Sequence, residues 1–172
     1  MSISTTITTT VVKTASPESE ETITSFLDNH PQGALTTIDI HGRLHGSVVN
    51  AFLIDAHSYA FMTKKDTQKY TNLQANATIS FVSFDPFSRT EAELEGVAYL
   101  VEDQEEASRI LDVIDKAADK GRWHVSPYVT TQDDYALFMM YPRKLHMVTY
   151  WDKTRGLKAF HEWIDFEITV KD

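Results

Sequence analysis

The stretch FMTKKDTQKYTNL, residues 61–73, carries the pattern that most constrains the fold of this chain. Apolar and β-branched residues end at Thr63 and helix-tolerant polar residues follow, which predicts a strand running into a short helix over 65–75. Such a junction presents free backbone N–H groups to an anion. Thr63 adds a hydroxyl group, and Lys64 or Lys65 adds positive charge together with Lys69. On spacing alone two interpretations stay open: a phosphate site, and a lysine-rich turn that faces water.

Strand-like segments lie on both sides of this stretch. They are rich in β-branched and aromatic residues and are separated by short turns, which favours antiparallel pairing. The pattern predicts strands over 34–40, 44–54, 58–63, 78–84, 91–101, 135–140 and 144–150, and leaves 163–170 open as a last strand. Apolar periodicity predicts a helix from Ser16-Pro17 to His30, with Ser16 as its N-terminal cap, and another helix over 103–120. These elements predict an antiparallel barrel of about six strands with helices at its rim.

The composition excludes several classes of protein. Hydrophobic residues make up 42% and charged residues 24% of the 172 positions, as in ordinary globular proteins. The net charge of −9 argues against nucleic acid and anionic membrane surfaces as partners, and no apolar run approaches the ~20 residues of a membrane span. The absence of cysteine excludes disulfides and thiolate metal sites. We therefore expect a cytoplasmic protein without a nucleic-acid or membrane partner.

The first residues differ in character from the rest of the chain. Residues 1–15 are rich in threonine and lack the charged-then-apolar order of a signal peptide. We expect a flexible N-terminal arm over 1–15, followed by one domain over 16–172.

Three parts of the sequence carry a family resemblance. They are GALTTID with GRLHGSVV over 33–49, the segment over 61–81 that ends in NATISF, and LEGVAYLVED over 94–103. In order and spacing they resemble the pyridoxamine 5′-phosphate oxidase-like family of flavoproteins. The resemblance implies a mainly β fold with peripheral helices, a six-stranded antiparallel Greek-key split β-barrel of the FMN-binding type. It also implies a homodimer that holds flavin mononucleotide (FMN) at the subunit interface.

The resemblance also implies which residues hold the cofactor. Residues of the second part would bind the phosphate and ribityl oxygens, residues of the first hairpin and Met62 would lie along the ring, and the partner subunit would contribute the loop near Thr90 and Glu91. Trp151 is a further candidate for a contact at the ring edge, and a tryptophan packed within the fold is the alternative. The expected cofactor-binding residues are Ser47, Val48, Val49, Asn50, Met62, Thr63, Lys64, Gln68, Lys69, Thr90, Glu91 and Trp151.

Departures from the family pattern bear on the reaction. Gln68 and Glu91 stand where the oxidase has Arg and Gln, and Ser47 and Phe52 stand where it has basic residues. We therefore expect a flavin-dependent oxidoreductase that does not oxidise vitamin B6, with a small-molecule substrate or electron donor that the sequence does not identify and no recognisable catalytic acid or base. The alternatives are a non-catalytic flavin-binding or stress-related protein, and a relative that binds deazaflavin or haem.

Histidines are the only remaining candidates for a metal site. His41 and His45 flank a turn, and His146 and His161 lack further ligands at a recognisable spacing. The sequence therefore predicts no metal site.

Overall fold

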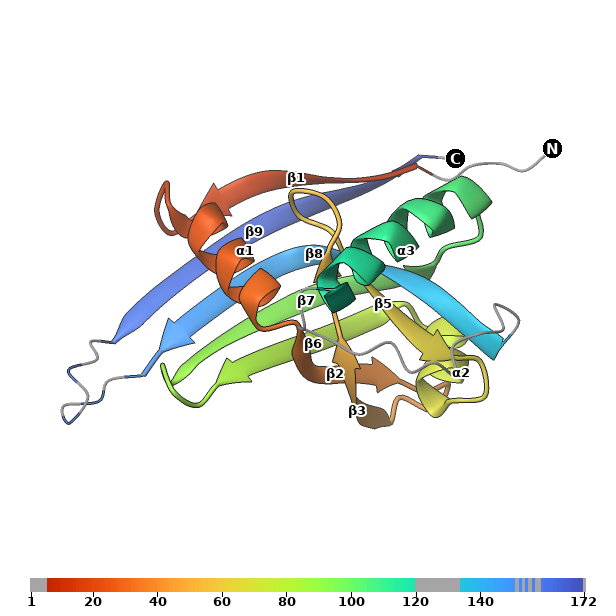
Figure 1. The fold of residues 1–172 in the computed structure, drawn as a ribbon, viewed down its shortest axis with the longest axis horizontal. Helices are drawn as coiled ribbons and strands as arrows, with labels where there is room; N and C mark the ends of the chain where they lie inside the picture. Colours follow the sequence, from red (N-terminus) through yellow and green to blue (C-terminus); the bar gives the residue numbers. More distant parts are fainter. Residues whose placement is uncertain are drawn as a thin grey trace.

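The computed structural model describes residues 6–119, 134–150, 152, 154, 156 and 159–171. Strands dominate this part of the chain, and all of their pairings are antiparallel (Figure 1). In chain order the elements are β1 (Thr6–Thr14), α1 (Ser19–Asn29), β2 (Gln32–Ile38), β3 (Leu44–Asn50), β4 (Phe52–Leu53), β5 (Tyr59–Lys64), α2 (Gln68–Ala75), β6 (Thr78–Asp85), β7 (Thr90–Leu100), α3 (Gln104–Asp119), β8 (Tyr135–Thr149) and β9 (Phe160–Lys171).

Six of these strands form the expected split barrel. The sheet runs β1-β9-β8-β7-β6-β2-β3, and β5 pairs with β8 on the side away from β7. β3 and β5, the ends of the six-strand path, also contact each other. The mainly β split-barrel fold that the sequence predicts is therefore confirmed. The short strand β4 beside β5, and β9 with β1 beyond β8, are additions to the six.

β8 is one long strand, where the sequence analysis expected two separate strands on either side of Pro142. Its first half pairs with β5 over Tyr135–Met140, and its second half pairs with β9 from Lys144 onward. Pro142 falls between the stretch that pairs with β5 and the stretch that pairs with β9, so its missing N–H group interrupts neither of these pairings. On the other side β7 pairs with β8 from Phe138 to Thr149, with a register shift between Glu95 and Gly96.

The expectation of a flexible arm over 1–15 is wrong for residues 6–14. They form β1, which pairs with β9 along its whole length. Ile7, Thr9 and Val11 are half-buried, whereas Thr8 and Thr10 between them are exposed. Threonine, valine and isoleucine favour strands, and β9 offers β1 an edge on which to form.

α1 begins at Ser19, three residues after the predicted cap, Ser16. The hydroxyl groups of both serines donate hydrogen bonds to Oε2 of Glu162 on β9. Ser19 is fully buried and Glu162 is 9% exposed, so the start of the helix is fastened to the sheet by a buried polar cluster. The predicted cap is thus used in a tertiary contact.

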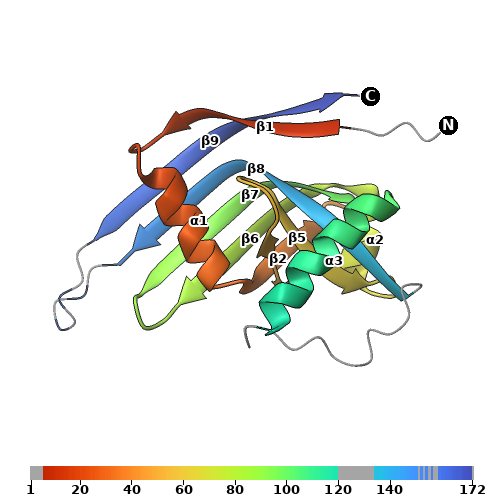
Figure 2. The same ribbon diagram turned by 45° about the horizontal axis from the view of Figure 1, so that its top comes forward.

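The helices cover different parts of the barrel (Figure 2). Ile23 and Leu27 of α1 are buried in the main core. Ile110 and Ile114 of α3 form a second core with Leu137 of β8 and its neighbours. None of the helices in the described part of the chain has the length and apolar character needed to cross a bilayer.

Candidate functional site

The junction between β5 and α2 is ordered by two threonines. Thr67 is the N-cap of α2, and its Oγ1 accepts a hydrogen bond from the Tyr70 N–H at 3.4 Å and donates one to the Lys64 carbonyl at 2.8 Å. Thr63 Oγ1 lies 3.1 Å from Thr67 Oγ1, and it is the donor because the Thr67 proton is already engaged. The N–H groups that precede Tyr70 in α2 have no intrahelical acceptor, so the junction favours an anion.

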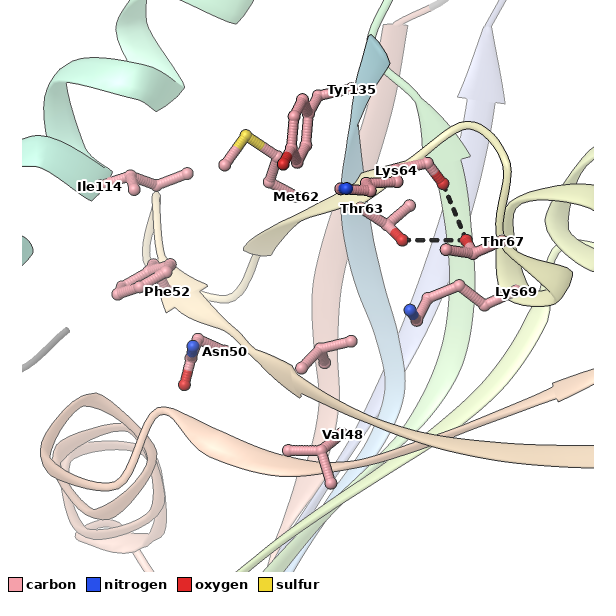
Figure 3. A pocket seen from close by; sticks show the side chains of 11 residues that line it. Val48, Asn50, Phe52, Met62, Thr63, Lys64, Thr67, Lys69, Ile114 and Tyr135 are labelled. Atoms are coloured by element: carbon pink, nitrogen blue, oxygen red, sulfur yellow. Dashed lines mark hydrogen bonds between the residues drawn. The ribbon is translucent and has the colours of Figure 1, made fainter. Parts of the chain in front are cut away.

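A cavity of about 230 Å³ opens beside this junction. In Figure 3, Thr63, Thr67 and Lys69 lie on one side of it, and Phe52, Met62 and Ile114 lie on the other. The cavity therefore has a polar, cationic side and an apolar side. Its lining consists of Val48, Val49, Asn50, Phe52, Met62, Thr63, Lys64, Thr67, Lys69, Ile114 and Tyr135.

Lys69 is the principal cation of the cavity. It projects from α2 into the cavity (Figure 3) and is half-buried, and this burial lowers the pKa of its ammonium group. No carboxylate of the described residues pairs with it. Lys64 is more exposed, and its Nζ lies 5.9 Å from the ring centroid of Tyr135. Lys69 therefore presents its positive charge to the cavity with no described carboxylate to balance it.

Seven of the twelve residues expected at the site line this cavity. They come from β3, β5 and α2, which the sequence separates and the barrel brings together: Val48, Val49, Asn50, Met62, Thr63, Lys64 and Lys69.

Ser47 and Gln68 adjoin the cavity in sequence but do not line it. The Gln68 amide donates to Asn72 Oδ1 at 2.8 Å, and the Asn72 amide donates in turn to Thr37 Oγ1 at 2.9 Å. The Gln68 side chain therefore takes part in a hydrogen-bond network that links α2 to β2. Ser47 Oγ is buried and has no hydrogen-bond partner among the described residues.

Thr90 and Glu91, at the start of β7, also lie outside the cavity of their own chain. Thr90 Oγ1 is 2.8 Å from Thr149 Oγ1, and Glu91 accepts a hydrogen bond from the Tyr150 hydroxyl at 2.7 Å. Their role toward a cofactor held by a second subunit stays a prediction. Trp151 lies outside the described residues.

Four cavity residues were not expected as ligands: Phe52, Thr67, Ile114 and Tyr135. Thr67 had a local signal, because a threonine just before a helix is a typical cap. Ile114 reaches the cavity because α3 packs against the barrel. Tyr135 reaches it because it pairs with Lys64 across β5 and β8. Neither contact could be recognised from a local sequence pattern. Phe52 stands where the resemblance expects a basic residue, and it contributes to the apolar side of the cavity.

Comparison with known proteins identifies the family. The family model described as pyridoxamine 5′-phosphate oxidase matches residues 19–149. No curated protein matches the sequence.

Solved structures share the fold at low sequence identity. A putative pyridoxamine 5′-phosphate oxidase from Listeria innocua has a TM-score of 0.58 and 20% identity, covering 73% of this chain and 94% of that one. A heme-binding protein from Mycobacterium smegmatis has a TM-score of 0.64 and 18% identity, covering 86% and 58%. An F420 reductase has a TM-score of 0.57 and 20% identity, covering 70% and 94%. The match of the family model over most of the sequence places this chain in the pyridoxamine 5′-phosphate oxidase family.

Proposed function

We propose that this chain binds FMN in the cavity between α2, β3 and β5, and that it is a flavin-dependent oxidoreductase. The observation that carries the proposal is Lys69: a half-buried ammonium group that faces the cavity and has no carboxylate partner among the described residues. A phosphate group supplies that partner. Charge-assisted hydrogen bonds of this kind are short and strong.

The two sides of the cavity suit the two ends of FMN. The phosphate would lie against Lys69 and the start of α2, with the Thr63 and Thr67 hydroxyls beside it. The flavin ring would lie along the apolar side, against Met62 and Phe52. Ser47 precedes Val48 on β3, and its buried hydroxyl has no hydrogen-bond partner among the described residues. These residues fit a ligand that is anionic at one end and flat and apolar at the other.

The cavity of a single chain is small and open for such a ligand. Its volume of about 230 Å³ lies below the ~300–1,000 Å³ of typical small-molecule sites. Val48 lines it and is nevertheless 67% exposed. A second copy of the chain that covers Val48 would complete the enclosure, so we propose a homodimer with the cofactor at its interface.

When bound, the flavin supplies the hydride and electron chemistry, and the protein supplies binding and orientation. Lys69 fixes the phosphate end, and Phe52 and Met62 restrict the other end and exclude water from it. Phe52 brings no charge to the position where the family pattern has a basic residue. For this reason we propose a reaction other than oxidation of a phosphorylated vitamin B6 vitamer.

Two alternatives remain from the same family: a deazaflavin or haem as ligand, and a carrier without turnover. The F420 reductase and the heme-binding protein have this fold, but at 20% and 18% identity they indicate the fold alone. Among the described residues no histidine lines the cavity to ligate haem iron. Lys69, with which no carboxylate of the described residues pairs, favours a ligand with a phosphate group.

Titration of tag-free protein with FMN and with riboflavin, followed by flavin fluorescence, tests the proposal. The phosphate is the difference between the two ligands, so FMN should bind more tightly by about 1–3 kcal/mol. Equal affinities, or no binding of FMN, would contradict it. Addition of haemin under the same conditions checks for a Soret band. Reduction of the bound flavin by a nicotinamide nucleotide or another donor separates an enzyme from a carrier.

A further inference from the structure

Two histidines meet on the outer face of the sheet, on β8 and β9. Nε2 of His146 lies 2.6 Å from Nε2 of His161. The ring centroids are 4.6 Å apart and the ring planes are nearly perpendicular, at 86°. The two nitrogens that can serve as metal ligands thus lie within hydrogen-bonding distance of each other, on side chains from two different strands.

The register of β8 and β9 produces this convergence. His146 pairs with Trp163, and His161 pairs with Val148, so the two histidines are diagonal neighbours on one face. Glu162 projects to the opposite face, where it holds Ser16 and Ser19. The two histidines are fifteen residues apart in the sequence, and the pairing of β8 with β9 brings them into contact.

We propose that His146 and His161 together chelate one divalent transition-metal ion, Zn²⁺ or Cu²⁺, through their Nε2 atoms. Imidazole nitrogen is a ligand that both ions accept readily. Tetrahedral zinc with Zn–N bonds of about 2.05 Å would set the two nitrogens roughly 3.3 Å apart, so the pair has only to open slightly. His161 is exposed and free to make that adjustment.

The surroundings of the pair are acidic on the β7 side. Glu93 lies opposite His146 in the β7–β8 register, and its Oε1 accepts a hydrogen bond from the Ser80 hydroxyl at 2.8 Å. Burial, His161 and Lys144 lower the pKa of His146, while Glu93 and Glu91 oppose this shift.

The pair supplies two protein ligands, and water completes the coordination shell. No set of three or more potential metal ligands is assembled anywhere in the described part of the chain. The site shares no residue with the cofactor cavity. Its test is therefore independent of flavin binding.

The experiment uses tag-free, full-length protein that has been treated with a chelator and is titrated with Zn²⁺ by calorimetry. We expect one ion per chain. His161→Ala removes an exposed side chain and should lower the affinity by about a hundredfold, the loss expected when a two-point attachment becomes a single one. His146→Ala should have the same effect. His41→Ala, which removes an exposed histidine from the β2–β3 turn, is the matched control and should bind zinc as the wild type does.

Cu²⁺ provides a second readout, because its electron paramagnetic resonance spectrum reports coordinated nitrogen. We expect a spectrum with two nitrogen ligands in the wild type and one in the His161→Ala variant. Unchanged zinc affinity in His161→Ala, no zinc binding by the wild type, or loss of binding in the His41→Ala control would each overturn the proposal.

Discussion

Thr63 and Thr67 face each other across the junction of β5 and α2, with their hydroxyl oxygens 3.1 Å apart. Thr63 is the buried penultimate residue of β5, and Thr67 is the cap of α2. The contact joins β5 to the start of α2, from which Lys69 projects into the cavity. A local sequence pattern thereby determines the position of the group that we assign to the cofactor phosphate.

Replacement of Thr67 by alanine tests this relationship. The variant loses the cap and the contact to Thr63, so the free energy of unfolding should fall by about 0.5–2 kcal/mol. FMN affinity should fall as well, because α2 no longer holds Lys69 in place. Thr67→Ser keeps the capping oxygen and should behave nearly as the wild type in denaturant unfolding and in FMN titration. Equal losses in both variants would show that the methyl group matters instead of the cap.

Gly96 on β7 lies against the backbone of β8. A Cβ at this position would meet the Tyr141 carbonyl oxygen and would lie 3.0 Å from Pro142 Cα, and both belong to the main chain. Gly96→Ala should therefore destabilise the protein by about 1–3 kcal/mol, measured by urea unfolding. Gly46→Ala is the control, since a Cβ there meets nothing within 4 Å. Similar stabilities of the two variants would contradict the close approach.

The polar cluster at the start of α1 gives a third prediction. Glu162→Ala leaves the buried Ser19 hydroxyl without its acceptor, so the variant should lose about 1–3 kcal/mol of stability. Ser19→Ala should cost less, because Ser16 still donates to the carboxylate. A double-mutant cycle of the two substitutions measures their coupling, and a coupling of zero would mean that the cluster does not fasten the helix.

The barrel could be predicted from the sequence because its strands are marked by local patterns. Alternating and β-branched runs identified β2, β3 and β5 to β7 to within a few residues. β1 was missed because a threonine-rich segment looks flexible until the edge of β9 is known. Pro142 suggested a break in β8, and only the change of partner from β5 to β9 explains why the strand continues.

The cofactor cavity and the histidine pair could likewise be predicted only where a local sequence pattern marks their residues. Met62, Thr63 and Lys69 could be placed from one continuous stretch of sequence, and they line the cavity. The position of Gln68 could not be predicted in this way, because its hydrogen bond to Asn72 depends on side-chain geometry within α2. The meeting of His146 and His161 depends on the β8–β9 register. Contacts made by strand pairing over long sequence separations carry no local signal.

The pH dependence of binding follows from Lys69. Burial lowers the pKa of Lys69 in the free protein, and a bound phosphate raises it again. The protonated form binds FMN, so the FMN-to-riboflavin affinity ratio should be at its full value below the lowered pKa and should fall as the pH rises through it. Use of the ratio cancels changes in the flavin ring. Lys69→Arg keeps its charge and should show no such fall, and the same alkaline loss in that variant would assign it to another group.

The most direct test of the account is the effect of Lys69→Ala on FMN affinity. The phosphate loses a charge-assisted hydrogen bond, so FMN should bind more weakly by about 1–3 kcal/mol while riboflavin binding is unchanged. Lys65→Ala is the matched control, because Lys65 is an exposed lysine of the same junction that does not line the cavity. FMN binding that is unchanged in Lys69→Ala, or lost equally in Lys65→Ala, would contradict the assignment of the phosphate to this site.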